Sequence, residues 1–575
     1  MKAFPVLWLL AVTAGVILVR QPEAGAAIVG DIPSSIEHLM TAVPQSEVGL
    51  GTPTDADVLA GFYQQRQYKP VWIDDRGLNG RGQSLLQAFR SATDDGLDPS
   101  EYLPPETSAV NLAASNSAPT LRVPATAAAP SLPLSPRSAG DGALAGSGAT
   151  ADRLASMDVA LNLALLRYAS DVRRGRTVQS GNEDGRVALK VMDPLGVLTK
   201  AAESNDPKAF VASLAPIDPI YIGLRRLLAR YRAIAAAGGW PTVPEGPKLE
   251  PGMTDRRTAA LRLRLQLTDD LPVTEQGRAL DRFDDAVEQA VRRFQGRNGL
   301  AADGVVGPRT LAALNVPAQD RIRQILVNLE RSRWLPDDLG NPYVMVNLAA
   351  FELEVVESGR TALQMRVVVG ELDKRTPVFS DAISYIEFNP YWNIPRSIAV
   401  KEELPQLRGN PGALSAKNIK ILSSDGEVVD PYMVDWSTVN SNHFPYRLRQ
   451  EPGQRNALGR IKFMFPNPYD IYLHDTPSRS LFQRSVRAFS HGCIRVEKPL
   501  ELAELLLRQT DGWQRSRIDG VIKDGRNRAV SLAKPVPVHI VYLTAWMSPD
   551  GRAQFRDDLY NRDATLVAAL DAHRE

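Results

Sequence analysis

The chain is poor in several features that mark common classes of protein. It has one cysteine, Cys493, in 575 residues, so no intramolecular disulfide can form. Its 67 basic and 66 acidic residues leave a formal net charge of +1, which gives no electrostatic basis for binding nucleic acid. Beyond residue 19 no apolar run is long enough to cross a bilayer. These scarcities argue against a disulfide-stapled fold, a nucleic-acid-binding protein and a protein with several membrane spans.

The first 26 residues predict an exported protein. Lys2 gives a positive start, residues 3–19 are apolar, and residues 24–26 (AGA) fit the small-residue pattern of a cleavage site. The alternative is an uncleaved anchor, because the apolar stretch is near the lower length limit for spanning a bilayer. We expect cleavage, since the stretch is short and the small-residue site follows it. Any contact with a membrane is then confined to this segment.

Length and pattern predict about three or four domains. In residues 34–246 helical spacing recurs, as at Leu161, Leu165, Tyr168 and Val172, which lie at intervals of 4, 3 and 4. Residues 106–150 are dominated by Ala, Ser, Pro, Gly and Thr and have too little bulky apolar surface to pack. We therefore predict a helical domain at 34–246 that is interrupted by a flexible insertion at 106–150.

A compact helical unit at residues 247–317 and a linker helix within 318–342 follow. One helix face in the first of these is apolar: Phe283, Val287, Val291 and Phe294. From residue 343 the pattern changes to short β-rich segments: YVMVNL, FELEVV, MRVVVG, ISYIEF, DIYLHD and PVHIVYLTA. The prediction is a multidomain α+β chain with a β-rich, sandwich- or barrel-like domain at 343–545 and a C-terminal tail at 546–575.

Within the β-rich domain the strand pattern fails between residues 398 and 456. A loop of this length inside a compact domain is usually functional, so we expect a cap over a site; the alternative is an ordinary surface insertion. Trp392 directly precedes this insertion. Its ring is a candidate for the wall of a substrate groove, or it is part of a core.

The scarcest chemical residues are concentrated in residues 474–496, HDTPSRSLFQRSVRAFSHGCIRV. This block contains Cys493 together with His474 and His491, two of only six histidines. A thiolate is the reactive form of cysteine, and a histidine can accept its proton. The backbone N–H groups of Gly492 to Ile494 are candidates to hold an oxyanion. The plain alternative is a small buried cysteine without a chemical role.

His474 followed by SHGCIR at residues 490–495 resembles the signature of the L,D-transpeptidase (YkuD-type) catalytic domain. The chain departs from many members at Asp475, where they have Gly, and at Val496, where they have Asn. The residues before the β-rich domain are similar to the N-terminal scaffold and the three-helix peptidoglycan-binding domain of the larger members.

The resemblance implies a mixed β-sandwich catalytic domain with a cap, and a transferase that acts in cell wall biogenesis and cell shape in the periplasm. It implies that Cys493 is acylated, that His474 is the proton acceptor and donor, and that Ser490, His491 and Gly492 support the motif and the oxyanion hole. Arg495 and, by position, Trp392 are candidates to bind substrate. The partners implied are peptidoglycan stem peptides and possible cell wall synthases, with no cofactor and no metal.

Three alternatives remain open on the sequence. The same site with water or another amine as acceptor would be a carboxypeptidase or an exchange or attachment enzyme. His474, His491 and Cys493 are legitimate zinc ligands, although they lack the usual spacing of zinc motifs. A non-catalytic scaffold that binds cell wall would need none of these residues.

Overall fold

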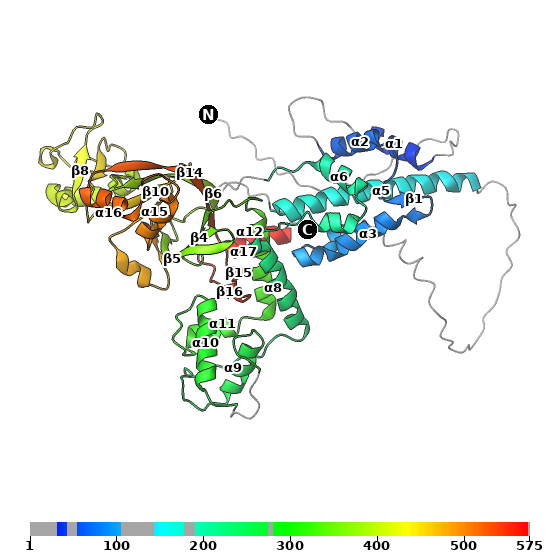
Figure 1. The fold of residues 1–575 in the computed structure, drawn as a ribbon, viewed down its shortest axis with the longest axis horizontal. Helices are drawn as coiled ribbons and strands as arrows, with labels where there is room; N and C mark the ends of the chain where they lie inside the picture. Colours follow the sequence, from blue (N-terminus) through cyan, green and yellow to red (C-terminus); the bar gives the residue numbers. More distant parts are fainter. Residues whose placement is uncertain (1–30, 43–53, 105–142, 178–189, 274–279, 573–575) are drawn as a thin grey trace. The chain divides into compact units, whose positions relative to one another are not determined.

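The structure, a computed structural model, describes residues 31–42, 54–104, 143–177, 190–273 and 280–572 (Figure 1). The predicted signal segment 1–26 and residues 106–142 of the predicted insertion lie outside these ranges. The chain divides into two compact units: one is formed from residues up to 84, 103–164 and 194–202, and the other from 85–102, 165–193 and 203 onward. No helix in the described part is long and apolar enough to cross a membrane.

The first unit is mostly helical. Its elements are α1 (Ile32–Ala42), α2 (Asp55–Gln65), β1 (Ile73–Asp74), β2 (Gly77–Leu78), and parts of α3 (Gly80–Arg90), α5 (Ala143–Arg174) and α6 (Pro194–Glu203). Buried Asp158 of α5 accepts hydrogen bonds from the Tyr63 hydroxyl at 2.7 Å and the Trp72 N–H at 2.6 Å, and so ties three segments together. Because α5 begins at Ala143, the last residues of the predicted insertion are helical, as their alanines favour.

The second unit begins with helices that precede the sheet. They are η1 (Ser91–Asp95), η2 (Pro99–Glu101), α7 (Pro207–Ala212), α8 (Pro219–Ala236), α9 (Arg257–Gln266), α10 (Asp285–Arg297), α11 (Pro308–Leu314) and α12 (Ala318–Arg333). The region of α9 to α11 has a core of its own, to which the predicted face from Phe283 to Phe294 contributes. Helix α12 packs along α8, and its Asn328 and Ser332 are fully buried, so it is more than a linker.

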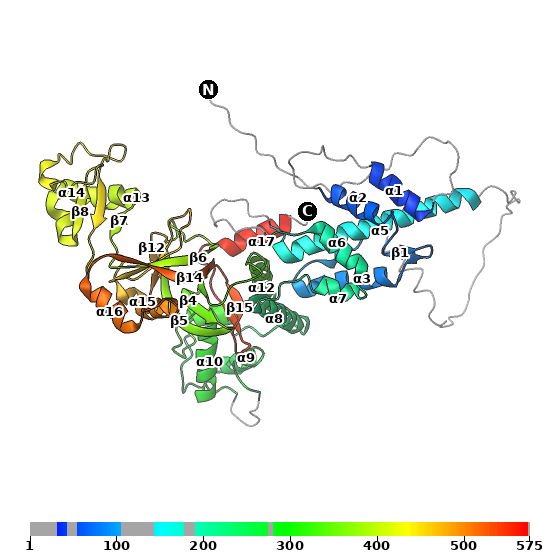
Figure 2. The ribbon, with the colours of Figure 1, turned by 45° about the horizontal axis from the view of Figure 1, so that its top comes forward.

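A nine-stranded sheet forms the centre of the second unit (Figure 2). Its strands are β3 (Tyr343–Asn347), β4 (Glu352–Glu357), β5 (Arg360–Gly370), β6 (Phe379–Phe388), β10 (Ile461–Met464), β11 (Leu473–His474), β12 (Ala488–Ser490), β13 (Ile494–Val496) and β14 (Arg528–Val541). Their order is β12-β5-β13-β11-β10-β6-β14-β3-β4, and β4 also pairs with β5, so the sheet folds back around one core. Helices α15 (Pro499–Leu507) and α16 (Arg515–Asp524) add apolar side chains to that core. The predicted multidomain α+β fold class is confirmed.

The segment between β6 and β10 folds separately from this sheet. It contains β7 (Trp392–Ile394), α13 (Arg396–Ile398), η3 (Ala399–Glu403), α14 (Leu404–Gly409), η4 (Pro411–Lys417), β8 (Ile419–Leu422), η5 (Pro431–Met433) and β9 (Arg447–Gln450). Strands β7, β9 and β8 form their own sheet over a small apolar core that includes Leu407, Leu414 and Trp436. The predicted insertion is thus a subdomain with a core of its own, which a loop would not have.

The segment after β14 is also ordered. Predicted as a tail, it forms β15 (Ala545–Met547), β16 (Ala553–Phe555) and α17 (Arg562–Ala572). Buried Phe555, Tyr560 and Leu566 give it an apolar face, and α17 packs against α12. The region predicted as a C-terminal tail therefore contains helix and strand up to residue 572; η6 (Arg479–Gln483) completes the elements described.

Candidate active site

The chemical residues lie on one face of three adjacent strands. Antiparallel pairing places Lys462 of β10 opposite His474 of β11, and parallel pairing places Arg495 of β13 beside His474. Paired residues share a face and side chains alternate along a strand. Tyr472 and Cys493, two residues before His474 and Arg495, therefore lie on the same face as those residues. The residues between them, including Leu473 and Ile494, are fully buried in the core on the other face.

Cys493 lies directly before β13 and is half-buried. Its Sγ donates a long hydrogen bond to the carbonyl oxygen of Asp470, at 3.6 Å. Burial raises the pKa of the Cys493 thiol, while hydrogen bonds from Tyr472 and the positive charge of Lys462 act in the opposite direction. The resting side chain is therefore a neutral thiol that has groups ready to stabilise its anion.

His474 is held in one orientation and one tautomer. Its Nδ1 lies 2.6 Å from the carbonyl oxygen of Asp475, which can only accept a hydrogen bond, so Nδ1 carries the proton. The other ring nitrogen, Nε2, is left with a free lone pair. Burial, together with the charges of Arg495 and Lys462, lowers the pKa of His474 to about 3. The imidazole is therefore neutral near pH 7, in the form that accepts a proton.

The loop before Cys493 is fixed by its own hydrogen bonds. The Ser490 hydroxyl donates to the Cys493 carbonyl at 2.5 Å and accepts from the Gly492 N–H at 3.1 Å. The Ile494 N–H donates to the Tyr472 carbonyl at 3.1 Å. Two of the three amides expected to face an oxyanion are thus already used. Only the N–H of Cys493 has no acceptor among the described residues.

Gly492 has a backbone φ of +117°, a conformation that side-chain-bearing residues rarely adopt. The motif accordingly requires glycine at this position for its turn. His491, next to it, points outward, and its Nε2 lies 2.5 Å from a carboxylate oxygen of Glu402 in the insertion subdomain. Lys374 also lies 3.8 Å from Glu402. The subdomain is therefore joined to the cysteine loop by the contact between Glu402 and His491.

The two predicted substrate-binding residues lie in different settings. Arg495 is close enough to Cys493 for the charges to interact, and its buried Nε has no hydrogen-bond partner in the described part of the chain. A guanidinium with a spare donor near the thiol can bind a carboxylate. Trp392, by contrast, is half-buried against the core of the insertion subdomain and pairs with Gln450 of β9.

Three site residues were missed by sequence reasoning. Lys462 lies with its Nζ 3.9 Å from the centroid of the Tyr472 ring. Tyr472 lowers the pKa of the Cys493 thiol through hydrogen bonds, and Lys462 lowers it through its positive charge. Strand alternation from His474 could have indicated Tyr472, two residues earlier. No local pattern could have indicated Lys462, or Thr376, whose hydroxyl donates to the Gly492 carbonyl at 2.7 Å.

The predicted zinc alternative finds no geometric support: among the described residues no three His, Cys, Asp or Glu side chains are grouped to hold a metal ion. His474 and His491 instead bond to Asp475 and Glu402, respectively.

Comparisons with known proteins agree with this geometry. Residues 341–537 match the family model of the L,D-transpeptidase catalytic domain (YkuD), residues 57–228 match a scaffold domain, and residues 260–314 match a domain described as "Putative peptidoglycan binding domain". A Haemophilus influenzae protein described as "Putative L,D-transpeptidase" is 37% identical over 247 residues, which are 43% of this chain and 49% of that protein. The matched part is thus about half the length of that relative.

Solved structures with similarity include two L,D-transpeptidases. The one from Xylanimonas cellulosilytica is 17% identical with a TM-score of 0.18, and the match covers 52% of this chain and 99% of that chain. The one from Stackebrandtia nassauensis is 14% identical with a TM-score of 0.20, and covers 52% and 96%. On the three domain matches and the curated relative, the resemblance seen in the sequence is confirmed: residues 341–537 match the L,D-transpeptidase catalytic domain, and they follow regions that match a scaffold domain and a peptidoglycan-binding domain.

Proposed function

We propose that this protein is a cysteine-dependent L,D-transpeptidase that forms 3-3 cross-links between peptidoglycan stem peptides. Cys493 is the nucleophile and His474 is the proton acceptor and donor. One observation carries the proposal: within the matched domain, β11 and β13 place both side chains on one face, with His474 Nδ1 bound so that Nε2 is free. A thiol and a neutral imidazole on one face supply the nucleophile and the base that such catalysis uses.

The reaction follows from these positions. When a tetrapeptide stem binds, the Cys493 proton passes to His474 Nε2 and the thiolate attacks the carbonyl carbon at the junction of an L and a D centre. The new C–S bond makes an oxyanion, which the Cys493 N–H and the Tyr472 hydroxyl stabilise. The bond to the terminal D-residue then breaks, and its amine leaves with the proton from His474. An amine of a second stem attacks the thioester, loses its proton to His474 and releases the free thiol.

The electrostatics support a proton transfer that follows substrate binding. A thiol with a raised pKa and an imidazole with a lowered one are both neutral at rest. Substrate excludes water and brings the carbonyl to the sulfur, so that transfer and attack occur together. Arg495 binds a carboxylate of the donor stem through its spare Nε, while Ser490 and Gly492 keep the loop in shape.

The other parts serve this reaction. The insertion subdomain, joined to the cysteine loop through Glu402 and His491, caps the site and limits access by water. The domain at residues 260–314 holds the enzyme on peptidoglycan. The chain acts after export, in the periplasm, where its N-terminal segment has been cleaved or anchors it. Its role is in cell wall synthesis and remodelling, beside other synthases.

Mass spectrometry of muropeptides tests the proposal. Incubation of the mature protein with defined tetrapeptide stems should give cross-linked dimers and release D-alanine, and Cys493→Ala and Cys493→Ser should give neither product. Tripeptide without dimer would instead identify a carboxypeptidase, and exchanged stems an exchange enzyme. Loss of activity in a chelator would point to the zinc alternative. Wild-type turnover by Cys493→Ala would rule out the covalent mechanism. An unchanged cell wall phenotype in Cys493→Ala, with no product from the wild-type protein, would support the non-catalytic scaffold.

A further inference from the structure

A short loop after β5 lies between the cysteine motif and the C-terminal segment. It runs from Gly370 to Thr376, and its start is tied to the motif because the Glu371 N–H donates to the Ser490 carbonyl at 2.9 Å. Gly370 can have no side chain, since an added Cβ would lie 2.1 Å from the Lys374 carbonyl. The loop is therefore tightly closed, and its two ends lie close together.

Thr376 connects this loop to the reacting cysteine. It is fully buried, and its hydroxyl donates to the Gly492 carbonyl at 2.7 Å while accepting from the Gly370 N–H at 3.0 Å. The Gly492 carbonyl and the Cys493 N–H belong to one planar trans peptide, in which they point in opposite directions. By holding the carbonyl, Thr376 fixes the direction of the one N–H in the motif that remains free for an oxyanion.

The C-terminal segment holds both ends of the loop. The Tyr560 hydroxyl donates to the Gly370 carbonyl at 2.6 Å, and the Arg562 guanidinium donates to the Thr376 carbonyl at 3.2 Å. Both residues lie beyond the catalytic match, which ends at residue 537. Both side chains are buried, and the Arg562 guanidinium lies 5.0 Å from the centroid of the Tyr560 ring.

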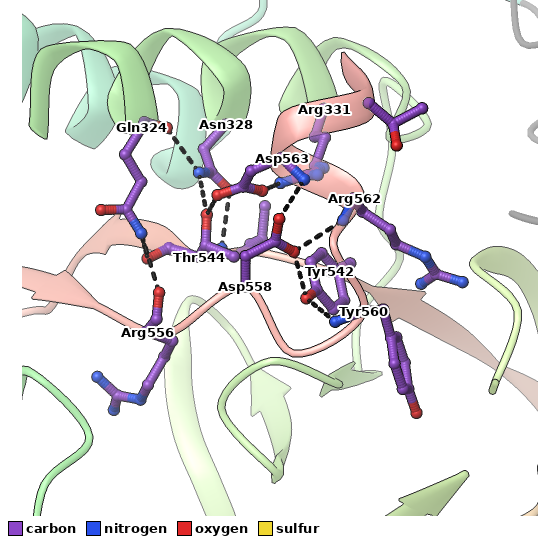
Figure 3. Close-up of polar contacts among 12 residues, drawn as sticks. Gln324, Asn328, Arg331, Tyr542, Thr544, Arg556, Asp558, Tyr560, Arg562 and Asp563 are labelled. Carbon is purple, nitrogen blue, oxygen red and sulfur yellow. Dashed lines mark hydrogen bonds and ion pairs between the residues drawn. The ribbon is translucent and has the colours of Figure 1, made fainter. Parts of the chain in front are cut away.

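This segment is itself rigidly anchored (Figure 3). The Asp558 carboxylate accepts from the Tyr542 hydroxyl at 2.7 Å and from the Arg562 N–H at 2.8 Å, and so fixes the backbone that carries Arg562. Asp563 pairs with Arg331 of α12 at 2.5 Å and accepts from the Thr544 hydroxyl at 2.6 Å. Figure 3 shows the Tyr560 and Arg562 side chains extending away from the Asp558 carboxylate.

We propose that Tyr560 and Arg562 are positioning residues for the acylation step, acting through Thr376 on the direction of the Cys493 N–H. This inference rests on the proposed function, because it assigns that N–H to the oxyanion. It makes the C-terminal segment a part of the catalytic machinery of this chain. A purely structural role would instead lower stability and leave the chemistry of the folded enzyme intact.

The test compares Thr376→Val and Tyr560→Phe with two controls. Thr376→Ser keeps the hydroxyl. Tyr102→Phe removes an equally buried tyrosine hydroxyl, bonded to Asp171 at 2.8 Å, that makes no contact with the loop. Loss of one oxyanion donor costs about 100- to 1,000-fold in kcat in other acyl transferases, so a donor held less firmly should cost at least about 10-fold. We expect that loss in kcat for Thr376→Val and Tyr560→Phe, with KM within about twofold, and near wild-type kcat in both controls.

Two further readouts separate the possible failures. Alkylation of Cys493 by iodoacetamide needs no oxyanion hole, so its rate should match wild type in every variant. Amide hydrogen exchange of the peptide that carries residues 488–494 should be faster in Thr376→Val and Tyr560→Phe than in wild type and Tyr102→Phe. A kcat that falls equally in Tyr102→Phe, or is not restored in Thr376→Ser, would overturn the inference, as would unchanged exchange. A wild-type protein that shows this protection but acylates no stem would instead refute the proposed function.

Discussion

The protonation state of the Cys493–His474 pair gives the sharpest prediction. In many activated thiols a thiolate–imidazolium pair exists before substrate arrives, and the thiol is then reactive even at acid pH. Here the structure predicts the opposite, because the pKa of Cys493 lies above its ordinary value of 9.0 and that of His474 lies at about 3. Each pH unit below a pKa lowers the ionised fraction tenfold, so at pH 7 the thiolate should be less than about 1% of the protein.

The assay is the rate of alkylation by iodoacetamide between pH 5 and pH 10. Because Cys493 is the only cysteine, the label that is taken up reports this residue alone, and Cys493→Ala gives the background. The rate should rise about tenfold for each pH unit from pH 6 to pH 8, and no plateau should appear below pH 9. A plateau between pH 5 and pH 8 would mean that an ion pair exists at rest, and would refute the reasoning.

The remaining predictions concern three neighbours of the thiol. Lys462→Met removes a positive charge that lowers the pKa of the thiol, so its alkylation at pH 8 should be several-fold slower than that of wild type. Lys462→Arg keeps the charge and should react at nearly the wild-type rate. Equal rates in Lys462→Met and wild type would show that the charge is screened. His474 has a folded pKa of about 3, below its ordinary 6.5, so it contributes stability above pH 6.5 that is lost as the pH falls toward 3. Between pH 7 and pH 5 the free energy of unfolding of wild type should therefore fall by about 2 kcal/mol more than that of His474→Gln, as measured by urea unfolding. An equal fall in both proteins would contradict the low pKa. Gly492→Ala places a Cβ at a φ of +117° and 3.3 Å from the Ile471 side chain, so it should cost about 1–3 kcal/mol and most of the acylation rate; an unchanged melting temperature and rate would show that the turn can relax.

Much of the catalytic domain was predictable because its information is local. Period-two alternation identified β3, β4, β5, β6 and β14, since each strand buries one face against a common core. The cysteine motif was predictable for a related reason. Its turn, its hydroxyl support from Ser490 and its nucleophile all lie within four consecutive residues. The strand β11 is only two residues long, yet the histidine in it was identified by its distance from the motif along the chain.

The rest of the site depends on pairings between distant parts of the chain. Lys462 lies beside His474 only because β10 and β11 are antiparallel in this register, and a shift of one residue would turn Lys462 into the core. The sequence of the insertion predicts a loop, because its many Gly, Pro and Asn residues interrupt the spacing of the apolar residues that form its small core. In each of these cases the deciding contact is tertiary, and the local pattern is compatible with several outcomes.

The C-terminal segment shows this limit most clearly. Its composition is mixed, and its two strands are only three residues long, so residues 546–575 carry no strong pattern. Yet Tyr560 bonds to a carbonyl 190 positions earlier, and that loop in turn bonds to Gly492, 116 positions after Thr376. A hydroxyl and a carbonyl have no sequence signal for each other, because any tyrosine can donate to any backbone oxygen within reach. Since the direction of the Cys493 N–H is set through these bonds, the precision of the site depends in part on Tyr560 and Arg562, which neither the motif nor the domain match at 341–537 contains.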